Sequence, residues 1–475
     1  MAIKREKTKE TKFHHGLISI VAMAAIMLVA IVMFGAEPQI PLIFGCAVAG
    51  LVALWVGFSW DEILDGMLKG IFPSLEAILI LLLIGVLVGV WIASGTVPTL
   101  IYYGLMVISA KYFLVATFAI CTIVAFAIGS WGTVGTVGLA FMGIGLALGF
   151  DAPLIAGCVI SGAYLGEVIS PLSDATNLAA AVVSRSVFDI VRKMIPLGVI
   201  GFVVTAVIYT MIGLQNGGGD AAEVTASIQP LMESIATTFN ITPVALLPLI
   251  IMIVCILIKL PAIPSMLIGS IAGMIIAIPL QGASLADLIN IGFAGYVSNT
   301  GQELLDNLLT AGGLSSMLNT ISIVIIAMAF GGLMQHTGQM QAFVAPMVNH
   351  IKRTGALKAL TSVSCIFMNI ILPDQYLGIS VPGQMFGEEF KKRKISRVEL
   401  GDCLLGGGAV TSPLIPWNTC GIYCSTILGV GAMAYMSSAY FCLLMPVITI
   451  IAGFVLKSHH DTEDDAAAEP VATAA

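Results

Sequence analysis

Two acidic residues interrupt a long apolar stretch of the chain and are its best candidates for chemistry. Glu167 and Asp174 flank Ser170-Pro171, where a helix must stop because proline lacks the N–H donor and clashes with the preceding turn. A carboxylate enclosed by apolar groups takes up a proton, and Na⁺ with hard oxygen ligands can replace that proton. A site with these two mutually exclusive occupants could exchange one ion for the other. We therefore expect Asp174 to be the principal ion-binding residue.

Uncharged oxygen donors accompany the two acids and could complete a Na⁺ site around Asp174. These donors are Ser170, Ser173, Thr176 and Asn177. The apolar stretches 154–160 and 178–183 on either side favour a buried setting. The alternative is that one of the two acids lies near the water interface and is merely solvated.

Three further polar segments could line the same cavity. A second proline break, at Pro413 and Pro416, offers neutral ligands where the first break offers charge, although a plain proline kink is the alternative. Asp374 also has a structural alternative, as the N-cap of a helix that starts after Pro373. The candidate ligands in the three segments are Thr133 and Thr136, Asp374 and Gln375, and Ser412, Asn418 and Thr419.

The composition places these residues in a membrane protein. The chain has 475 residues, of which 58% are hydrophobic and only 10% charged, so its apolar surface exceeds what a soluble domain can bury. Apolar runs of membrane-spanning length recur along the chain, which predicts an all-α polytopic fold. The nine cysteines are scattered, mostly within apolar runs, and we interpret them as small core residues rather than as disulfides or zinc ligands.

The sequence also contains a duplication. Gly166, Ser170-Pro171-Leu172 and several other short matches return at a nearly constant separation, for example as Gly408 and Ser412-Pro413-Leu414. Each half predicts five transmembrane helices, a re-entrant hairpin with a polar tip and a broken helix, and an odd number of spans inverts the second half. The expected regions are an N-terminal tail (1–16), a first repeat (17–213), an extracytoplasmic linker (214–242), a second repeat (243–457) and a disordered tail (458–475).

The distribution of charge supports this topology. If both termini lie in the cytoplasm, every one of the 20 Lys and Arg residues except Lys111 falls on the cytoplasmic side. No Lys or Arg lies within the proposed core, so a dianionic substrate would lack a charged clamp, although helix ends could still bind a carboxylate. No phosphate-binding loop is present, so nucleotide hydrolysis does not drive transport. We expect no enzymatic activity, no cofactor and no nucleic-acid partner.

Four motifs carry a resemblance to a known family. Gly129-Ser-Trp-Gly-Thr-Val-Gly-Thr-Val, Gly162-Ala-Tyr-Leu-Gly-Glu, Ser170-Pro-Leu-Ser-Asp-Ala-Thr-Asn-Leu-Ala and Leu372-Pro-Asp-Gln-Tyr-Leu-Gly resemble segments of the NhaC family of Na⁺/H⁺ antiporters, within the ion transporter superfamily. The resemblance covers essentially the whole chain. It implies inverted repeats with paired hairpins and broken helices, and a homodimer. One branch of this family resembles a malate/lactate antiporter.

These observations predict a secondary transporter that exchanges Na⁺ for H⁺ across a prokaryotic inner membrane. The alternative is a Na⁺- or H⁺-coupled carboxylate exchanger, such as a malate/lactate antiporter, which the missing core cation disfavours. A channel or a structural membrane protein is a third possibility, and the paired hairpins and broken helices argue against it. Na⁺, H⁺ and the lipid bilayer are the expected partners.

Overall fold

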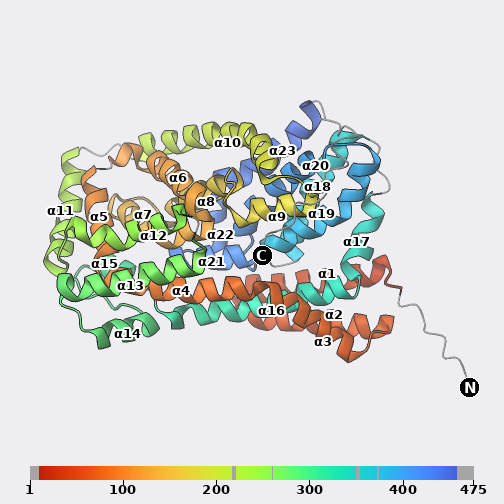
Figure 1. The fold of residues 1–475 in the computed structure, drawn as a ribbon, viewed down its shortest axis with the longest axis horizontal. Helices are drawn as coiled ribbons and strands as arrows, with labels where there is room; N and C mark the ends of the chain where they lie inside the picture. The colour runs from red at the N-terminus through yellow and green to blue at the C-terminus, as the bar shows by residue number, and fades with distance from the viewer. Residues whose placement is uncertain are drawn as a thin grey trace, which may run out of the picture.

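The computed structural model describes residues 10–107, 109–216, 221–258, 260–348, 353–371 and 374–456, and it is helical throughout (Figure 1). Within these residues there is no β-strand, and an isolated bridge pairs Tyr296 with Ala311. The predicted C-terminal tail, most of the N-terminal tail and the Leu372-Pro373 dipeptide of the second hairpin lie outside the described residues. The all-helical fold with apolar helices is that of a polytopic membrane protein.

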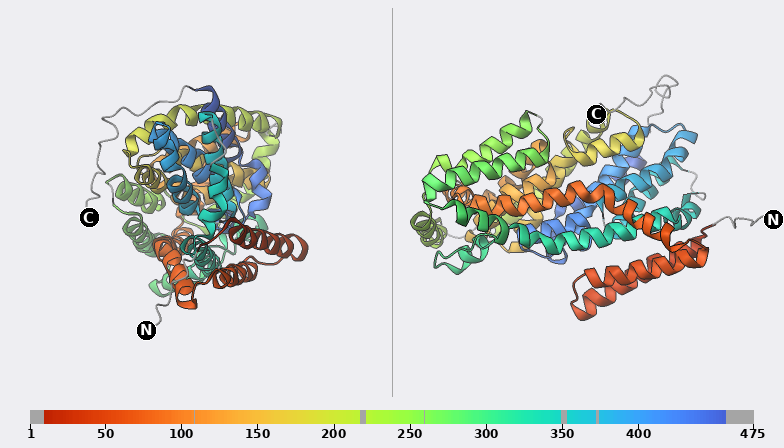
Figure 2. Two further views of the ribbon diagram at one scale, coloured as in Figure 1. Left: turned by 90° about the vertical axis from the view of Figure 1, so that its right-hand side faces the viewer. Right: turned by 60° about the horizontal axis from the view of Figure 1, so that its bottom comes forward.

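The first half begins with a layer of long helices along one side of the molecule. Its elements are α1 (Phe13–Leu28), the π-helical turn η1 (Val29–Met33), α2 (Gln39–Val56), α3 (Trp60–Ile71), η2 (Phe72–Ser74), α4 (Leu75–Ala93) and α5 (Thr96–Val107). The amphipathic helix α3 starts at a capping box formed by Ser59 and Glu62. Figure 2 shows the first helices, in red, at the edge of the molecule.

The rest of the first half forms the centre of the molecule. Its elements are η3 (Ala110–Tyr112), α6 (Phe113–Thr133), η4 (Val134–Gly138), α7 (Leu139–Ala147), α8 (Ala152–Val168), α9 (Asp174–Val183) and α10 (Val187–Asn216). Helix α6 kinks at Gly129, whose φ of 76° and ψ of 172° lie in a region that only glycine adopts readily. The kink separates the apolar part of α6 from the polar segment that contains Thr133.

The second half follows α11 (Ala221–Thr238), which lies in the predicted linker. The outer elements are η5 (Pro243–Leu246), α12 (Leu247–Leu257), α13 (Ala262–Gln281), α14 (Leu285–Ala294), α15 (Glu303–Leu309), η6 (Leu314–Met317), α16 (Leu318–His336) and α17 (Gln339–Val348). The central elements are α18 (Thr354–Ile371), α19 (Gln375–Lys392), α20 (Arg397–Cys403), η7 (Leu404–Gly408), η8 (Ala409–Leu414), α21 (Thr419–Leu428), α22 (Ala432–Tyr435), η9 (Met436–Ser438) and α23 (Tyr440–Val455).

Two large apolar clusters hold the helices together. The larger one joins the central helices of both halves, and the second one packs α1 and α2 against α16. Outward-facing apolar side chains on α2, α10, α13 and α23 remain exposed, among them Trp55, Val203, Ile275 and Ile451. Such apolar faces suit contact with lipid. All nine cysteines are buried, as expected for small core residues.

Six helices of the described residues are long and apolar enough to cross a membrane, and the number reaches nine if each of three bent helix pairs counts as one span. Shorter apolar helices, among them α1, α8 and α23, add to these. The expected ten spans, the two re-entrant hairpins and the inversion of the halves stay predictions, because length and composition alone do not assign a side of the membrane to any helix.

Candidate ion-binding site

The site forms where three interruptions of helical structure meet. Helix α8 ends at Val168 and α9 begins at Asp174, with the proline break between them. The start of α19 packs against this region, since α19 contacts α9. The segment before the break between η8 and α21 packs against it too, since η8 contacts α8. The structure thus brings residues of the first half against residues of the second half.

Glu167 is the buried acid at the centre of this meeting point, with only 6% of its surface exposed. The Gln375 amide Nε2 donates to Glu167 Oε2 over 3.2 Å. The hydroxyl group of Ser130 lies beside the same carboxyl group. Among the described residues no Lys or Arg forms an ion pair with Glu167, so its charge is met only by neutral dipoles. A buried carboxylate without a cationic partner is costly, so a bound proton or a bound cation would neutralise it.

Gln375 is itself held in place by Cys420. The thiol Sγ of Cys420 lies 3.1 Å from Gln375 Oε1 and donates to it, so the amide nitrogen is directed at Glu167. All three side chains are buried. The sequence analysis found Glu167 and Gln375 but took Cys420 as a core residue, because nothing in its spacing distinguishes it from the other cysteines.

Asp374 is the second buried acid of the site. Its Oδ1 accepts from the backbone N–H groups of Tyr376 at 2.8 Å and Leu377 at 3.2 Å, which makes it the N-cap of α19. Its Oδ2 accepts from the Thr419 hydroxyl at 3.1 Å. The helix-cap alternative therefore describes one oxygen of Asp374, and the second oxygen links the hairpin to the second break.

The expectation that Asp174 is buried is wrong. It is the first residue of α9 and its side chain is exposed, as is Leu172 in the break before it. The physical reason is that Asp174 lies on the outward face of the first turn of α9, whereas Ala175 and Thr176 on its other face are buried, and Glu167 stays inside at the end of α8. Asp174 nevertheless lies within electrostatic range of Glu167 and Tyr376. Solvation of one acid, the alternative in the sequence analysis, applies to Asp174.

Two hydroxyl groups attach the first break to its neighbours. The Ser170 hydroxyl donates to the Phe126 carbonyl oxygen at 2.5 Å, and the Thr176 hydroxyl donates to the carbonyl oxygen of Glu167 at 3.0 Å. The second bond satisfies a carbonyl that the end of α8 leaves without a helical partner. These two hydrogen bonds hold the end of α8, and with it Glu167, in position.

The other two polar residues of the break differ in availability. The Asn177 amide is exposed and donates to the backbone carbonyl oxygens of Pro171 at 3.0 Å and Ser173 at 2.8 Å. The Ser173 hydroxyl is buried and has no hydrogen-bond partner among the described residues. Ser173 is thus free to bind an ion, whereas Asn177 stabilises the turn.

The two threonines beyond the Gly129 kink donate their hydroxyl protons to backbone carbonyl oxygens of the preceding residues. Thr133 donates to the Gly129 carbonyl oxygen at 2.8 Å, and Thr136 donates to the Gly132 carbonyl oxygen at 2.6 Å. Both hydroxyl oxygens keep lone pairs that could bind a cation. Ser130, just after the kink, is buried, and its Oγ has no well-aligned hydrogen-bond partner among the described residues.

The second break is ordered by Asn418 and by a residue that the sequence analysis missed, Asn369. Asn418 caps α21 by accepting from the Cys420 N–H at 3.1 Å, and its amide donates to the Asn369 carbonyl oxygen at 3.3 Å. The Asn369 amide donates to the Gly408 carbonyl oxygen at 2.6 Å and to Thr411 Oγ1 at 2.9 Å. Ser412 donates to the Ala409 carbonyl oxygen at 2.7 Å, within its own segment.

Comparison with known proteins identifies the family. The family model described as "Na+/H+ antiporter family" matches residues 162–455, which include both breaks. This chain belongs to the Na⁺/H⁺ antiporter family. It is 35% identical to the Na⁺/H⁺ antiporter NhaC of Alkalihalophilus pseudofirmus, over 91% of this chain and 93% of that protein. The predicted resemblance to the NhaC family is confirmed.

Other relatives of similar sequence identity are antiporters of different substrates. The arginine/ornithine antiporter ArcD of Halobacterium salinarum is 33% identical over 94% of this chain and 92% of its own length. The malate-2H⁺/Na⁺-lactate antiporter of Bacillus subtilis is 34% identical over 88% of this chain and 89% of its own length. Family membership therefore establishes an antiporter and leaves its substrate to the residues of the site.

The antiporter site has no cluster typical of a transition-metal centre. Within the described residues no group of three or more His, Cys, Asp or Glu side chains could hold a metal ion together. Na⁺ has different requirements, because hydroxyl, amide and backbone carbonyl oxygens are suitable ligands for a hard cation. Trp131 and Tyr423 close one side of this region, with stacked rings 4.5 Å apart and the Tyr423 hydroxyl donating to the Trp131 carbonyl oxygen.

Proposed function

We propose that this protein is a secondary transporter that exchanges Na⁺ for H⁺, and that Glu167 carries the exchanged proton. The observation behind this assignment is the burial of Glu167 with neutral partners only, principally Gln375. When protonated, the carboxyl group is neutral and needs no counter-ion. When Na⁺ replaces the proton, the ion compensates the charge of the carboxylate.

The remaining Na⁺ ligands come from buried oxygens around Glu167. Ser130 and Ser173 have hydroxyl groups without partners among the described residues, and Thr133 and Thr136 keep free lone pairs. Asp374, with Thr419, supplies a second carboxylate on the side of the other half. Asp174, exposed near Glu167, attracts cations from solution and thereby raises their concentration at the site.

The arrangement of the halves supports an alternating-access mechanism. We propose that they are inverted repeats of five spans, that residues 129–136 and 373–378 form hairpin tips, and that both termini lie in the cytoplasm of a prokaryote, with the protein in the inner membrane. The recurrence of breaks in corresponding places, at Pro171 and Pro413, supports this reading. The homodimer is a further proposal, which rests on the family resemblance.

Carboxylate exchange is the second candidate because one relative is a malate/lactate antiporter. Such a substrate would meet two buried acids, Glu167 and Asp374, and no lysine or arginine pairs with either of them among the described residues. Like charges in a desolvated site repel strongly. The charge of the site therefore favours a cation over a dicarboxylate.

Reconstitution into proteoliposomes tests the assignment. With a pH-sensitive dye inside the vesicles, adding Na⁺ alone should move protons, without any organic anion. Vesicles given malate or lactate together with Na⁺, and vesicles given arginine or ornithine, provide the comparison arms. Proton movement that requires an organic substrate would replace Na⁺/H⁺ exchange by the corresponding exchange, and ion flow without coupling would indicate a channel.

A further inference from the structure

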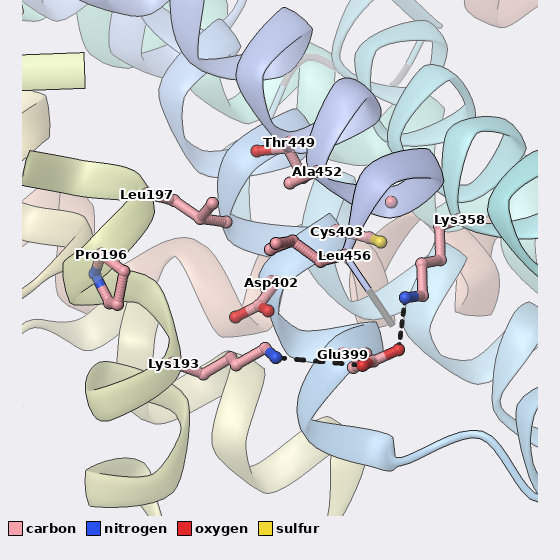
Figure 3. Close-up of a pocket in the computed structure, with 11 residues that line it drawn as sticks. Lys193, Pro196, Leu197, Lys358, Glu399, Asp402, Cys403, Thr449, Ala452 and Leu456 are labelled. Carbon is pink, nitrogen blue, oxygen red and sulfur yellow. Dashed lines mark ion pairs between the residues drawn. The ribbon is translucent and has the colours of Figure 1, made fainter. Parts of the chain in front are cut away.

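A cavity with both polar and apolar lining lies among α10, α18, α20 and α23, and none of the candidate ion-binding residues lines it (Figure 3). Its volume is about 90 Å³. Because a cavity needs only about 10–15 Å³ of such space to hold one water molecule, this cavity has room for several. Its polar lining consists of Lys193, Lys358, Glu399, Asp402 and Thr449.

The two lysines of the cavity are both engaged by one acid. Lys358 Nζ lies 2.5 Å from Glu399 Oε2, and Lys193 Nζ lies 3.9 Å from Glu399 Oε1 (Figure 3). Glu399 and Lys358 are buried almost completely, whereas the Lys193 side chain keeps 28% of its surface exposed. The cavity thus reaches the surface beside Lys193.

Asp402, one turn after Glu399 on α20, is left without such a partner. Only 6% of its surface is exposed, and its Oδ1 has no hydrogen-bond partner among the described residues. Thr449 Oγ1, on the wall contributed by α23, is also buried and without a partner there. Two buried oxygens that face the same small cavity are most simply satisfied by water or by a proton on the carboxylate.

We propose that Asp402 is a second proton-binding site of this transporter, filled from the aqueous phase through the water of this cavity. A proton delivered from the aqueous phase through that water forms an O–H bond with Asp402 Oδ1 and neutralises the carboxylate, and the resulting hydroxyl group can donate to a cavity water. The role of this proton in exchange rests on the proposed Na⁺/H⁺ function, whereas its binding does not.

Burial is the main reason why Asp402 binds a proton more readily than an exposed aspartate, and the charges around it adjust this affinity. Lys193 from α10 and Lys358 from α18 favour the ionised form, and Glu399 on α20 favours the protonated form. The Cys403 thiol is the other titratable group nearby, and α23 contributes the uncharged Thr449. Helices α9 and α19 also pack on α20, and none of their described side chains lines the cavity.

The position of the cavity connects it to the ion-binding site. Helix α18 carries Lys358 near its start and Asn369 near its end, and α20 continues directly into η7 and η8. The Asn369 amide binds Gly408 and Thr411 of those segments. A change of charge at Asp402 therefore acts on α18 and α20. The end of α18 is joined, through Asn369, to the segments that follow α20 beside the second break.

Infrared difference spectroscopy on the purified full-length protein tests proton binding without any transport. A pH titration should show a C=O band of a protonated carboxyl group that is lost in Asp402→Asn and kept in Asp189→Asn, an exposed acid on α10. In Lys193→Gln the midpoint of this band should rise by about one pH unit, because a favourable positive charge is removed. The proposal would be overturned if the C=O band is still present in Asp402→Asn. It would also be overturned if the pH midpoint of the band is the same in Lys193→Gln as in the unmodified protein.

The role in exchange is tested by the pH profile of Na⁺-driven proton movement in proteoliposomes. Lys193→Gln and Asp402→Asn should each displace the profile relative to Asp189→Asn, with all proteins matched for monodispersity and amount. Unchanged profiles would remove Asp402 from the exchange cycle even if its band titrates. Absence of Na⁺/H⁺ exchange in the unmodified protein would reject the proposed function instead, and the infrared result would stand by itself.

Discussion

Gln375 donates a hydrogen bond across 3.2 Å to Glu167, a residue 208 positions earlier in the chain. This bond joins the start of α19, in the second half, to the end of α8, in the first half. If the halves move relative to one another, either the hydrogen bond between Gln375 and Glu167 breaks or the two residues move together. A bound Na⁺ or H⁺ at Glu167 therefore acts directly on the contact between the halves.

The first prediction separates the two acids of the first break. Glu167→Gln should abolish Na⁺/H⁺ exchange, because it removes the titrating group at the buried position while keeping its shape. Asp174→Asn should retain exchange and raise the Na⁺ concentration needed for half-maximal rate by several-fold, since Asp174 is exposed. Proton movement in proteoliposomes across a range of Na⁺ concentrations measures both.

The outcome also distinguishes the structural assignment from the sequence-based one. If Asp174→Asn abolishes exchange while Glu167→Gln retains it, Asp174 is the ion-binding residue despite its exposure. Glu303→Gln, which changes an exposed acid on α15, serves as the control for loss of a negative charge.

The second prediction concerns the thiol that orients Gln375. Cys420→Ala removes the donor to Gln375 Oε1, and the amide can then turn away from Glu167. A lost buried hydrogen bond of roughly 1 kcal/mol corresponds to about a fivefold weaker apparent affinity for Na⁺. Cys420→Ser keeps a donor at this position and should behave like the unmodified protein. Equal affinities for the alanine and serine variants would exclude an orienting role for Cys420.

Much of the local structure followed from the sequence. Proline at positions 171 and 413 predicted the two breaks, and apolar runs predicted the long apolar helices, because both signals act within one helix. The partners of Glu167 could not be predicted in the same way. The contact with Gln375, the part played by Cys420 and the link through Asn369 depend on segments that pack together from distant parts of the chain.

Burial of the two acids shows the same limit. The apolar stretches around 154–160 and 178–183 suggested that both acids are enclosed, and only Glu167 is. Hydropathy reports the average environment of a segment. It does not report the direction in which a helix leaves a proline break, and that direction decides the exposure of Asp174.

The third prediction tests the proposed topology. Gln229 on α11 and Lys392 at the end of α19 are both exposed. A membrane-impermeant thiol reagent applied to intact cells should label Gln229→Cys and not Lys392→Cys, and inverted vesicles should give the opposite result. The nine native cysteines are buried, so the unmodified protein is the background control. Labelling of both variants from the same side would reject the inverted arrangement.

The fourth prediction uses the pH dependence of a loop outside the candidate spans. The backbone N–H of Thr300 donates to Asp306 Oδ1 at 2.6 Å and is the main reason why the pKa of Asp306 lies below its usual value. A carboxyl group with a lowered folded-state pKa stabilises the fold above its unfolded pKa. This stabilisation is lost as the pH falls from about 4 through the lowered value.

Hydrogen exchange at the amides of Thr300 and Gly301 measures this effect. Protection should be high at neutral pH, fall in acid, and be low at both pH values in Asp306→Asn. Asp287→Asn, at a separate helix start on α14, should leave these amides unchanged. Protection that is independent of pH in the unmodified protein would show that the carboxylate does not hold the loop.

The last prediction concerns the close packing that positions Glu167. A Cβ atom on Gly166 would lie 2.3 Å from the Thr122 carbonyl oxygen and 2.6 Å from the Ala125 Cβ, so α8 and α6 can approach this closely only with glycine. Gly166→Ala must push α8 away from α6 and should destabilise the protein by about 1–3 kcal/mol. Because Glu167 is the next residue, the same displacement should disturb its contact with Gln375 and slow exchange.

Gly50→Ala on α2, where a Cβ meets no atom within 4 Å, is the matched control. Thermal unfolding of the purified variants, followed by Na⁺-driven proton movement at equal protein amounts, gives both readouts. Equal melting temperatures and rates for the two variants would contradict the packing of α8 on α6 described above.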